Sequence, residues 1–153
     1  MEGVILLGSV IKSSQLTADM LNQATIPLIL CSYTNRITRL VEKCHYKSVN
    51  LNIKLAEALI RFPKAQRNKR ANDEIMKIVS QCHEPMFLKD YEILFDPRYD
   101  IDTIKVFTEI SRRQKVVVKW CGRLNENSLE YATPEYRDYH SFRIQDYDIT
   151  CVI

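Results

Sequence analysis

Apolar and polar positions follow two different patterns between residues 26 and 44 of the chain. A short apolar run at residues 27–31 predicts a buried strand, and the polar residues 32–35 that follow predict a tight turn. Beyond the turn, apolar residues recur at the spacing i, i+3, i+4, i+7, which is one face of an amphipathic helix. The residues with this spacing are Ile37, Leu40, Val41 and Cys44.

A strand, a tight turn and a helix N-terminus form the unit that cradles phosphate groups in P-loop proteins. Most of the phosphate-binding residues of that motif are missing from this chain. If Thr38 occupies the Ser/Thr position, the lysine position holds Ile37, and the two glycine positions hold Cys31 and Arg36. The pattern alone therefore indicates an ordinary strand–helix unit.

The rest of the chain alternates short apolar runs with amphipathic stretches. Further strands are expected at residues 46–52, 85–88, 116–120 and 148–153. One helix is expected at residues 14–24, with Ser13 or Ser14 as its cap, and another at residues 53–60, ending before Pro63. Two further helices are expected to begin after caps, one at Asn72 or Asp73 and one at Asp100 or Asp102. Residues 64–70 should be a basic connection, and residues 4–11 fit either a strand or a helical turn. Alternating strands and helices predict an α/β fold with a mostly parallel sheet of about five strands, with helices on both faces and the strand at 27–31 in the centre.

Composition changes this picture little. The 153 residues are 46% hydrophobic and 27% charged, which is typical of one globular domain. The apolar run at the start is too short to span a bilayer and lacks the features of a secretory signal, so a cytoplasmic protein without a membrane contact is expected. Five scattered cysteines without ligand spacing predict reduced thiols, with neither a disulfide nor a zinc site.

Charge is unevenly distributed along the chain. Residues 36–70 contain ten Lys or Arg against two Glu, a local +8, although the whole chain carries only +3. Such asymmetry is typical of a surface that meets nucleic acid or an acidic partner. The residues expected to form it are Arg61, Lys64, Arg67, Lys69 and Arg70. Because no aromatic residues alternate with residues 64–70, an acidic protein partner is favoured over DNA, and the solubilising charge of ordinary helix surfaces remains a third interpretation.

From residue 46 onward, the chain resembles BrxF, the family of small P-loop proteins of type 3 bacteriophage-exclusion (BREX) defence systems. The stretches that carry the resemblance are VNLNIKLAEAL with the later Pro63 and Arg67, YEILFDP, SRRQKVVVKWCG and LEYATPEYRDY. They extend over roughly two thirds of the chain, and the unit at residues 26–44 lies where that family has its P-loop. The resemblance implies a P-loop-NTPase-like three-layer sandwich that forms one domain, residues 1–153.

The chain departs from the family pattern at three places. The glycine-rich loop with its Lys is replaced by SYTNRIT, the Asp that orders Mg²⁺ aligns with Lys89, and a polar sensor Asn aligns with Cys121. These changes remove the backbone closure around phosphates, a positive charge and a metal partner, although Arg36 at the helix N-terminus is expected to replace part of the lost charge. The resemblance then implies a degenerate phosphate loop of Thr34, Asn35, Arg36 and Thr38. No cofactor is expected, with ATP as the disfavoured alternative.

Asp90 and Glu92 are the remaining candidates for nucleotide or metal chemistry. Their i, i+2 spacing would place both carboxylates on one side of a strand if the strand continued that far. An exposed strand end is the plainer interpretation, because phosphoryl transfer in P-loop proteins also needs the missing Lys.

The resemblance implies an accessory component of a BREX-type anti-phage system that acts by binding other BREX proteins. Two further classes stay open: an active or nucleotide-gated small ATPase of the same system, and a DNA-binding adaptor. The sequence also leaves open a homo-oligomer, and a partner-binding role for the C-terminal tyrosines at positions 131, 136, 139 and 147.

Overall fold

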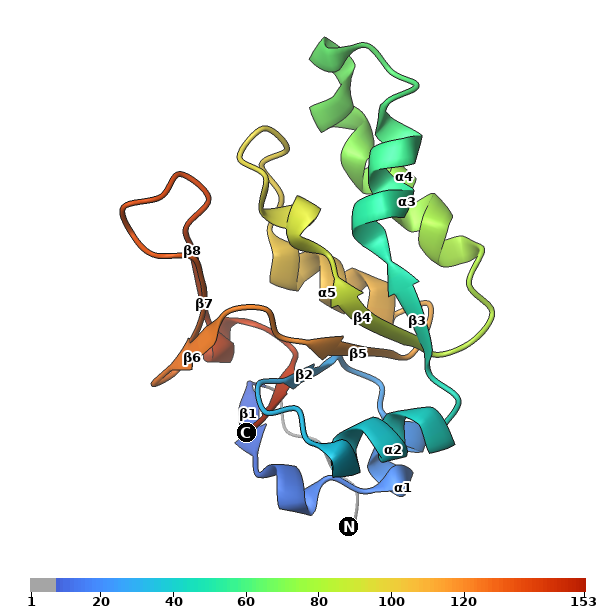
Figure 1. The fold of residues 1–153 in the computed structure, drawn as a ribbon, viewed down its shortest axis with the longest axis vertical. Helices are drawn as coiled ribbons and strands as arrows, with labels where there is room; N and C mark the ends of the chain where they lie inside the picture. Colours follow the sequence, from blue (N-terminus) through green and yellow to red (C-terminus); the bar gives the residue numbers. More distant parts are fainter. Residues whose placement is uncertain (1–7) are drawn as a thin grey trace.

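The computed structural model describes residues 8–153, and a parallel six-stranded sheet lies at its centre (Figure 1). The strands are β1 (Ser9–Ile11), β2 (Leu28–Leu30), β3 (Lys47–Asn50), β4 (Met86–Asp90), β5 (Val116–Lys119) and β9 (Thr150–Val152). Their order across the sheet is β1-β9-β2-β5-β4-β3, and every pairing is parallel. The predicted parallel sheet is thus confirmed, with β2 in its interior. The additional strand β1 comes from the segment at residues 4–11, of which residues 4–7 lie outside the described residues.

Helices cover both faces of this sheet (Figure 1). They are α1 (Ala18–Gln23), α2 (Asn35–Lys43), α3 (Leu51–Leu59), α4 (Arg67–Ser80) and α5 (Thr103–Ser111). Alternate side chains of each strand point to opposite faces, so β2 places Leu28 and Leu30 in the cluster under α1 and α2, and Ile29 in the cluster under α3, α4 and α5. The protein is therefore an α/β sandwich of three layers.

The strand–turn–helix unit predicted at residues 26–44 is confirmed by β2 and α2. Leu28, Ile29 and Leu30 are at most 1% exposed, as expected for an interior strand of a parallel sheet. Helix α2 begins after Thr34, whose side chain caps it, and buries Ile37 and Val41 against the sheet. The turn and the helix N-terminus consequently lie at the carboxyl edge of the sheet, where ligands bind in open α/β folds.

The single helix predicted at residues 14–24 is wrong. Residues Ser13–Gln15 form a 3₁₀ turn (η1), and α1 begins only after Thr17, whose side chain accepts a hydrogen bond from the backbone N–H of Met20 at 3.2 Å. The chain is extended between the two pieces because Leu16 turns inward and is completely buried.

The predicted start of α4 is also wrong. Asn72 and Asp73 lie inside the helix, which begins at Arg67 after a 3₁₀ turn, η2 (Lys64–Gln66). Residues 64–70, expected as a connection, therefore form η2 and the first turn of α4. The helix extends this far because Ala71 is completely buried among residues of α3 and α4.

Strand β3 and the start of α3 also differ slightly from the prediction of a strand through residue 52. The strand ends at Asn50, whose side chain accepts a hydrogen bond from the backbone N–H of Ile53 at 3.1 Å and so caps α3. The cap proposed at Asp102 is confirmed, since its carboxylate accepts from the backbone N–H of Lys105 at 3.1 Å.

The tyrosine-rich tail forms a second, antiparallel sheet that the sequence did not predict. Its strands are β6 (Arg123–Asn125), β7 (Ser128–Tyr131) and β8 (His140–Arg143), in the order β6-β7-β8. An aromatic cluster joins this small sheet to the main core: Phe95 stacks on Tyr131 with centroids 3.9 Å apart, and Phe142 meets Trp120 edge to face at 6.4 Å. Tyr136, by contrast, is 63% exposed.

Candidate functional site

The turn between β2 and α2 places the four loop candidates around the first turn of one helix. The two hydroxyl groups are engaged locally: Thr34 Oγ1 accepts from the backbone N–H of Ile37 at 3.3 Å, and Thr38 Oγ1 donates to the carbonyl of Thr34 at 3.1 Å. Asn35 is the first, exposed residue of the helix. Thr34 and Thr38 therefore stabilise the helix start rather than present hydroxyl groups outward.

Ile37, at the position of the P-loop lysine, is completely buried. Its neighbours are the apolar side chains beneath α1 and α2, including Leu16, Leu21 and Val117. A P-loop lysine has to reach the terminal phosphates with its ammonium group. The side chain at this position instead points into the core, so it cannot supply that charge.

Arg36 is also directed away from a phosphate site. Its guanidinium donates to the carbonyl of Ser13 at 2.7 Å and to the carbonyl of Leu16 at 2.6 Å, which ties η1 to α2. The backbone N–H groups at the start of the turn are used as well, because Cys31 and Ser32 both donate to the carbonyl of Val152, at 2.8 and 3.2 Å. The turn is thus closed by internal hydrogen bonds.

The acidic pair after β4 does not form the expected same-side arrangement, because the strand ends at Asp90 and Glu92 opens a 3₁₀ helix, η3 (Glu92–Phe95). Glu92 Oε1 accepts hydrogen bonds from the Asn52 side chain and from the backbone N–H of Tyr91, both at 2.9 Å. The Asn52 side chain in turn accepts from the backbone N–H of Ile93 at 2.8 Å. Glu92 therefore joins η3 to the start of α3.

A cavity of about 430 Å³ opens at the carboxyl edge between β4 and β5. It is lined by Lys89, Asp90, Glu92, Lys119, Trp120 and Cys121. Its two lysines and two carboxylates balance in charge. The ammonium of Lys119 lies 4.9 Å from the ring centroid of Tyr33, and the Tyr33 ring stacks on Phe87 with centroids 5.6 Å apart. The loop thus contacts the strand ends through an aromatic ring instead of through phosphate-binding groups.

Cys121 is the only thiol in this cavity and is a poor nucleophile there. Burial raises the pKa of Cys121 to about 11, so the thiol stays protonated at neutral pH. Across residues 8–153, no group of three or more His, Cys, Asp or Glu side chains is arranged to hold a metal ion.

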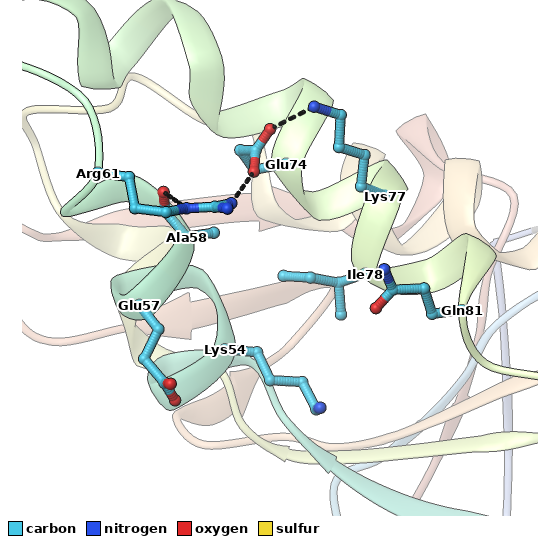
Figure 2. A pocket seen from close by; sticks show the side chains of 8 residues that line it. All are labelled: Lys54, Glu57, Ala58, Arg61, Glu74, Lys77, Ile78 and Gln81. Carbon is cyan, nitrogen blue, oxygen red and sulfur yellow. Dashed lines mark hydrogen bonds and ion pairs between the residues drawn. The ribbon is translucent and has the colours of Figure 1, made fainter.

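A second cavity, of about 420 Å³, lies between α3 and α4 (Figure 2). Glu74 on α4 is 3% exposed, and its carboxylate meets Arg61 at 3.2 Å and Lys77 at 3.0 Å. Figure 2 shows the two cations approaching this carboxylate from opposite sides. Arg61, predicted for the basic surface, thus helps to neutralise a buried acid.

The other basic residues of that predicted surface lie at the tip of the α3–α4 pair. Lys64 and Arg67 line a cavity of about 360 Å³ that the sequence did not reveal, because its other cation, Arg98, and its aromatic side chain, Tyr99, come from the loop after η3. Lys69 and Arg70 are exposed in the first turn of α4. The structure therefore brings Lys64 and Arg67 together and separates them from the ion pairs of Arg61.

Two cysteines form a pair that sequence spacing did not indicate. Cys31 follows β2, Cys151 lies in the adjacent strand β9, and their thiols interact. The interaction with Cys151 lowers the pKa of Cys31, whereas the interaction with Cys31 and burial raise the pKa of Cys151.

Comparisons of the chain with protein-family models, with curated proteins and with solved structures find no match in any of the three. The structure itself shows an α/β protein with a six-stranded parallel sheet and an internally closed loop after its interior strand β2. None of the helices within residues 8–153 has the length and apolar character needed to cross a membrane.

Proposed function

We propose that the chain is an accessory component of a BREX-type anti-phage defence system, with a degenerate P-loop fold, that acts by binding other proteins of that system and not by hydrolysing nucleotide. Two observations support the proposal. The sequence stretches from residue 46 onward resemble the BrxF family, and the strand–turn–helix unit begins at an interior strand of a parallel sheet, as a P-loop fold requires.

The complete burial of Ile37 is the observation that carries the loss of hydrolysis. Because Ile37 is packed in the core, a small motion of the loop would not bring a phosphate-binding group to this position. In P-loop NTPases, the Lys and the Mg²⁺ neutralise the charge that develops on the transferred phosphoryl group. Neither function has a replacement here, since Arg36 is bound to backbone carbonyls and exposed Lys89 aligns with the metal-binding Asp.

Nucleotide assays test this part of the proposal. Purified protein is expected to show no Mg²⁺-dependent ATP hydrolysis above a blank, and weak or absent binding of a fluorescent ATP analogue. The matched variant is Thr38→Ala, which removes the hydroxyl at the motif's Ser/Thr position and should change neither result. Mg²⁺-dependent turnover that disappears in Thr38→Ala would instead establish an active ATPase.

The defence role is tested separately, in cells that carry a BREX system from which this protein has been deleted. Re-expression of the chain is expected to restore phage resistance, and Thr38→Ala should restore it equally well. Affinity purification of the tagged chain should recover other BREX proteins. Full resistance without the chain would refute the role whatever the nucleotide assays show.

A further inference from the structure

Arg98 forms a fixed planar group on the surface of the loop that follows η3. Its guanidinium makes a forked contact with Asp96, with Nη2 2.6 Å from Oδ2 and Nε 3.0 Å from Oδ1. The same guanidinium lies over the ring of Tyr99, 5.5 Å from its centroid. The Arg98 side chain is nevertheless 71% exposed. The guanidinium is thus held by a carboxylate and a ring of the protein, while most of the side chain stays open to solvent.

A second pair of this kind lies at the tip of α3 and α4. The guanidinium of Arg70 lies over the ring of Phe62, 5.2 Å from its centroid. The carbonyl of Phe62 also accepts a hydrogen bond from Arg67 Nε at 3.0 Å, so one residue positions two arginines of the first turn of α4. Arg70 is exposed, as Arg98 is.

Positive charge concentrates beside these two planar groups. The cavity of about 360 Å³ at this tip is lined by Lys64, Arg67 and Arg98, together with Ala65, Asn68 and Tyr99, and no carboxylate lines it. The first turn of α4 also carries no acidic residue. Asp96 neutralises Arg98 through its forked contact, so the net positive charge of this surface comes from Lys64, Arg67 and Arg70. This surface, which we term the tip surface (Lys64, Arg67, Arg70, Arg98), therefore favours an anionic ligand.

We propose that the tip surface binds single-stranded nucleic acid, with phosphates contacting Lys64 and Arg67 and bases stacking on the guanidinium planes of Arg98 and Arg70. Unpaired bases stack on aromatic rings and on Arg planes, which a duplex does not allow because its bases are already stacked inside it. An acidic protein segment would need only the charges. The fixed planes of Arg98 over Tyr99 and of Arg70 over Phe62 are the feature that separates the two ligands.

This inference goes beyond the proposed function and does not depend on it. The tip surface is formed by η2, α4 and the η3–α5 loop, whereas the loss of hydrolysis rests on the β2–α2 turn. A failed nucleic-acid experiment therefore leaves the nucleotide and defence tests unchanged, and the reverse also holds.

Fluorescence anisotropy with labelled 15-nucleotide probes tests the proposal. Single-stranded DNA and single-stranded RNA of mixed sequence form two arms, a duplex of the same length the third, and a labelled poly-glutamate peptide the fourth. Binding of at least one single-stranded probe is expected to be at least fivefold tighter than binding of the duplex. The two phosphate contacts, at Lys64 and Arg67, predict a slope of about −1.4 for log K against log salt concentration.

Arg98→Lys is the decisive variant because it keeps the charge and removes the plane. Single-strand affinity is expected to fall about tenfold, since stacking of one base is worth a factor of that order. The double variant Lys64→Gln/Arg67→Gln removes both contacts and should flatten the salt slope to about zero. The matched control is Arg112→Gln/Arg113→Gln, which removes the same charge from exposed residues between α5 and β5, and its single-strand affinity should stay within about twofold of the wild type.

Ultraviolet cross-linking of the wild-type protein to the same probes provides a measurement without substitutions. Peptide mapping should place adducts in the segments that contain Tyr99 and Phe62. The proposal is overturned if no single-stranded probe binds at physiological salt, or if Arg98→Lys, shown to be folded by circular dichroism, binds as tightly as the wild type. Tighter binding of the poly-glutamate peptide than of any nucleic acid would assign the tip surface to an acidic protein partner and would equally overturn it.

Discussion

The hydroxyl group of Tyr91 accepts a hydrogen bond from the backbone N–H of Cys121 at 3.0 Å. The same hydroxyl donates to the carbonyl of Lys119 at 2.8 Å, so one completely buried side chain from the end of β4 satisfies two backbone groups at the end of β5. Its ring packs edge to face against Phe107 at 5.2 Å. Tyr91 thereby fixes the point at which the chain leaves the parallel sheet for the small antiparallel one.

Tyr91→Phe is expected to lower the free energy of unfolding by about 1–2 kcal/mol, because it leaves a partly buried N–H and a partly buried carbonyl without their partner. Urea denaturation monitored by circular dichroism measures the change. Tyr136→Phe removes the same hydroxyl from a side chain that is 63% exposed, and should change stability by no more than about 0.5 kcal/mol. Equal stabilities for the two variants would contradict the role assigned to Tyr91.

Ile37→Lys is expected to destabilise the protein without creating a nucleotide site. The substitution restores the lysine of the motif but places an unpaired ammonium in an apolar core, at a cost of about 3–5 kcal/mol. Ile37→Val, which only removes one methylene group, should cost about 1 kcal/mol. Thermal unfolding with and without Mg-ATP measures both effects, and a stabilisation of Ile37→Lys by Mg-ATP would show that this loop still forms a phosphate site.

Cys31 is expected to react with iodoacetamide at lower pH than Cys82. The reactive species is the thiolate, and the interaction with Cys151 lowers the pKa of Cys31, whereas burial raises the pKa of Cys82. Both side chains are half-buried, so access does not explain a difference between them. Alkylation rates across pH 6–10, read by peptide mass spectrometry, give the two midpoints.

The control for this prediction is Cys151→Ala, which removes the interacting thiol. Without that thiol, the pKa of Cys31 should rise, and its alkylation midpoint should move to higher pH while the midpoint of Cys82 stays unchanged. Indistinguishable Cys31 midpoints in the wild type and in Cys151→Ala would rule out the thiol pair as the cause.

Gly122→Ala is expected to disrupt the packing of the β6–β7 hairpin. A Cβ atom at this position would lie 1.8 Å from the carbonyl oxygen of Glu130, a backbone atom that cannot move without displacing β7. We expect a loss of about 3 kcal/mol or more. Thermal unfolding checks it, with the exposed β6 substitution Asn125→Ala as a control that should stay within about 0.5 kcal/mol of the wild type.

Elements with a strong local pattern could be predicted from the sequence. The apolar spacing of α2, the continuous apolar run of β5 and the cap at Asp102 each depend on residues within one element. The start of α4 could not be predicted, because Gln66 makes no side-chain cap and the helix is extended by the burial of Ala71 against another element. The second sheet was missed for the same reason, since stacking of Phe95 on Tyr131 joins residues distant in sequence.

In the candidate site too, features set by the local sequence could be predicted, whereas contacts between distant segments could not. Comparison of the turn with the P-loop motif identified Ile37 as the residue in place of the lysine. The hydrogen bonds of Arg36 could not be predicted, because their acceptors, the carbonyls of Ser13 and Leu16, lie more than one element away. The aromatic and cationic partners of Lys64 and Arg67 come from a loop some thirty residues later. Sequence spacing carries no information about such contacts.

Strand β9 lies between β1 and β2, and within residues 8–153 β1 pairs only with β9. Ser9 and Thr150, whose side-chain oxygens are 3.2 Å apart, are separated by 141 residues. On a translating ribosome, β1 therefore has no partner in this sheet until the residues of β9 have emerged from the exit tunnel. Until then, both β1 and one side of β2 present unpaired backbone to other chains, and a chaperone that covers strand edges during synthesis would act at this stage.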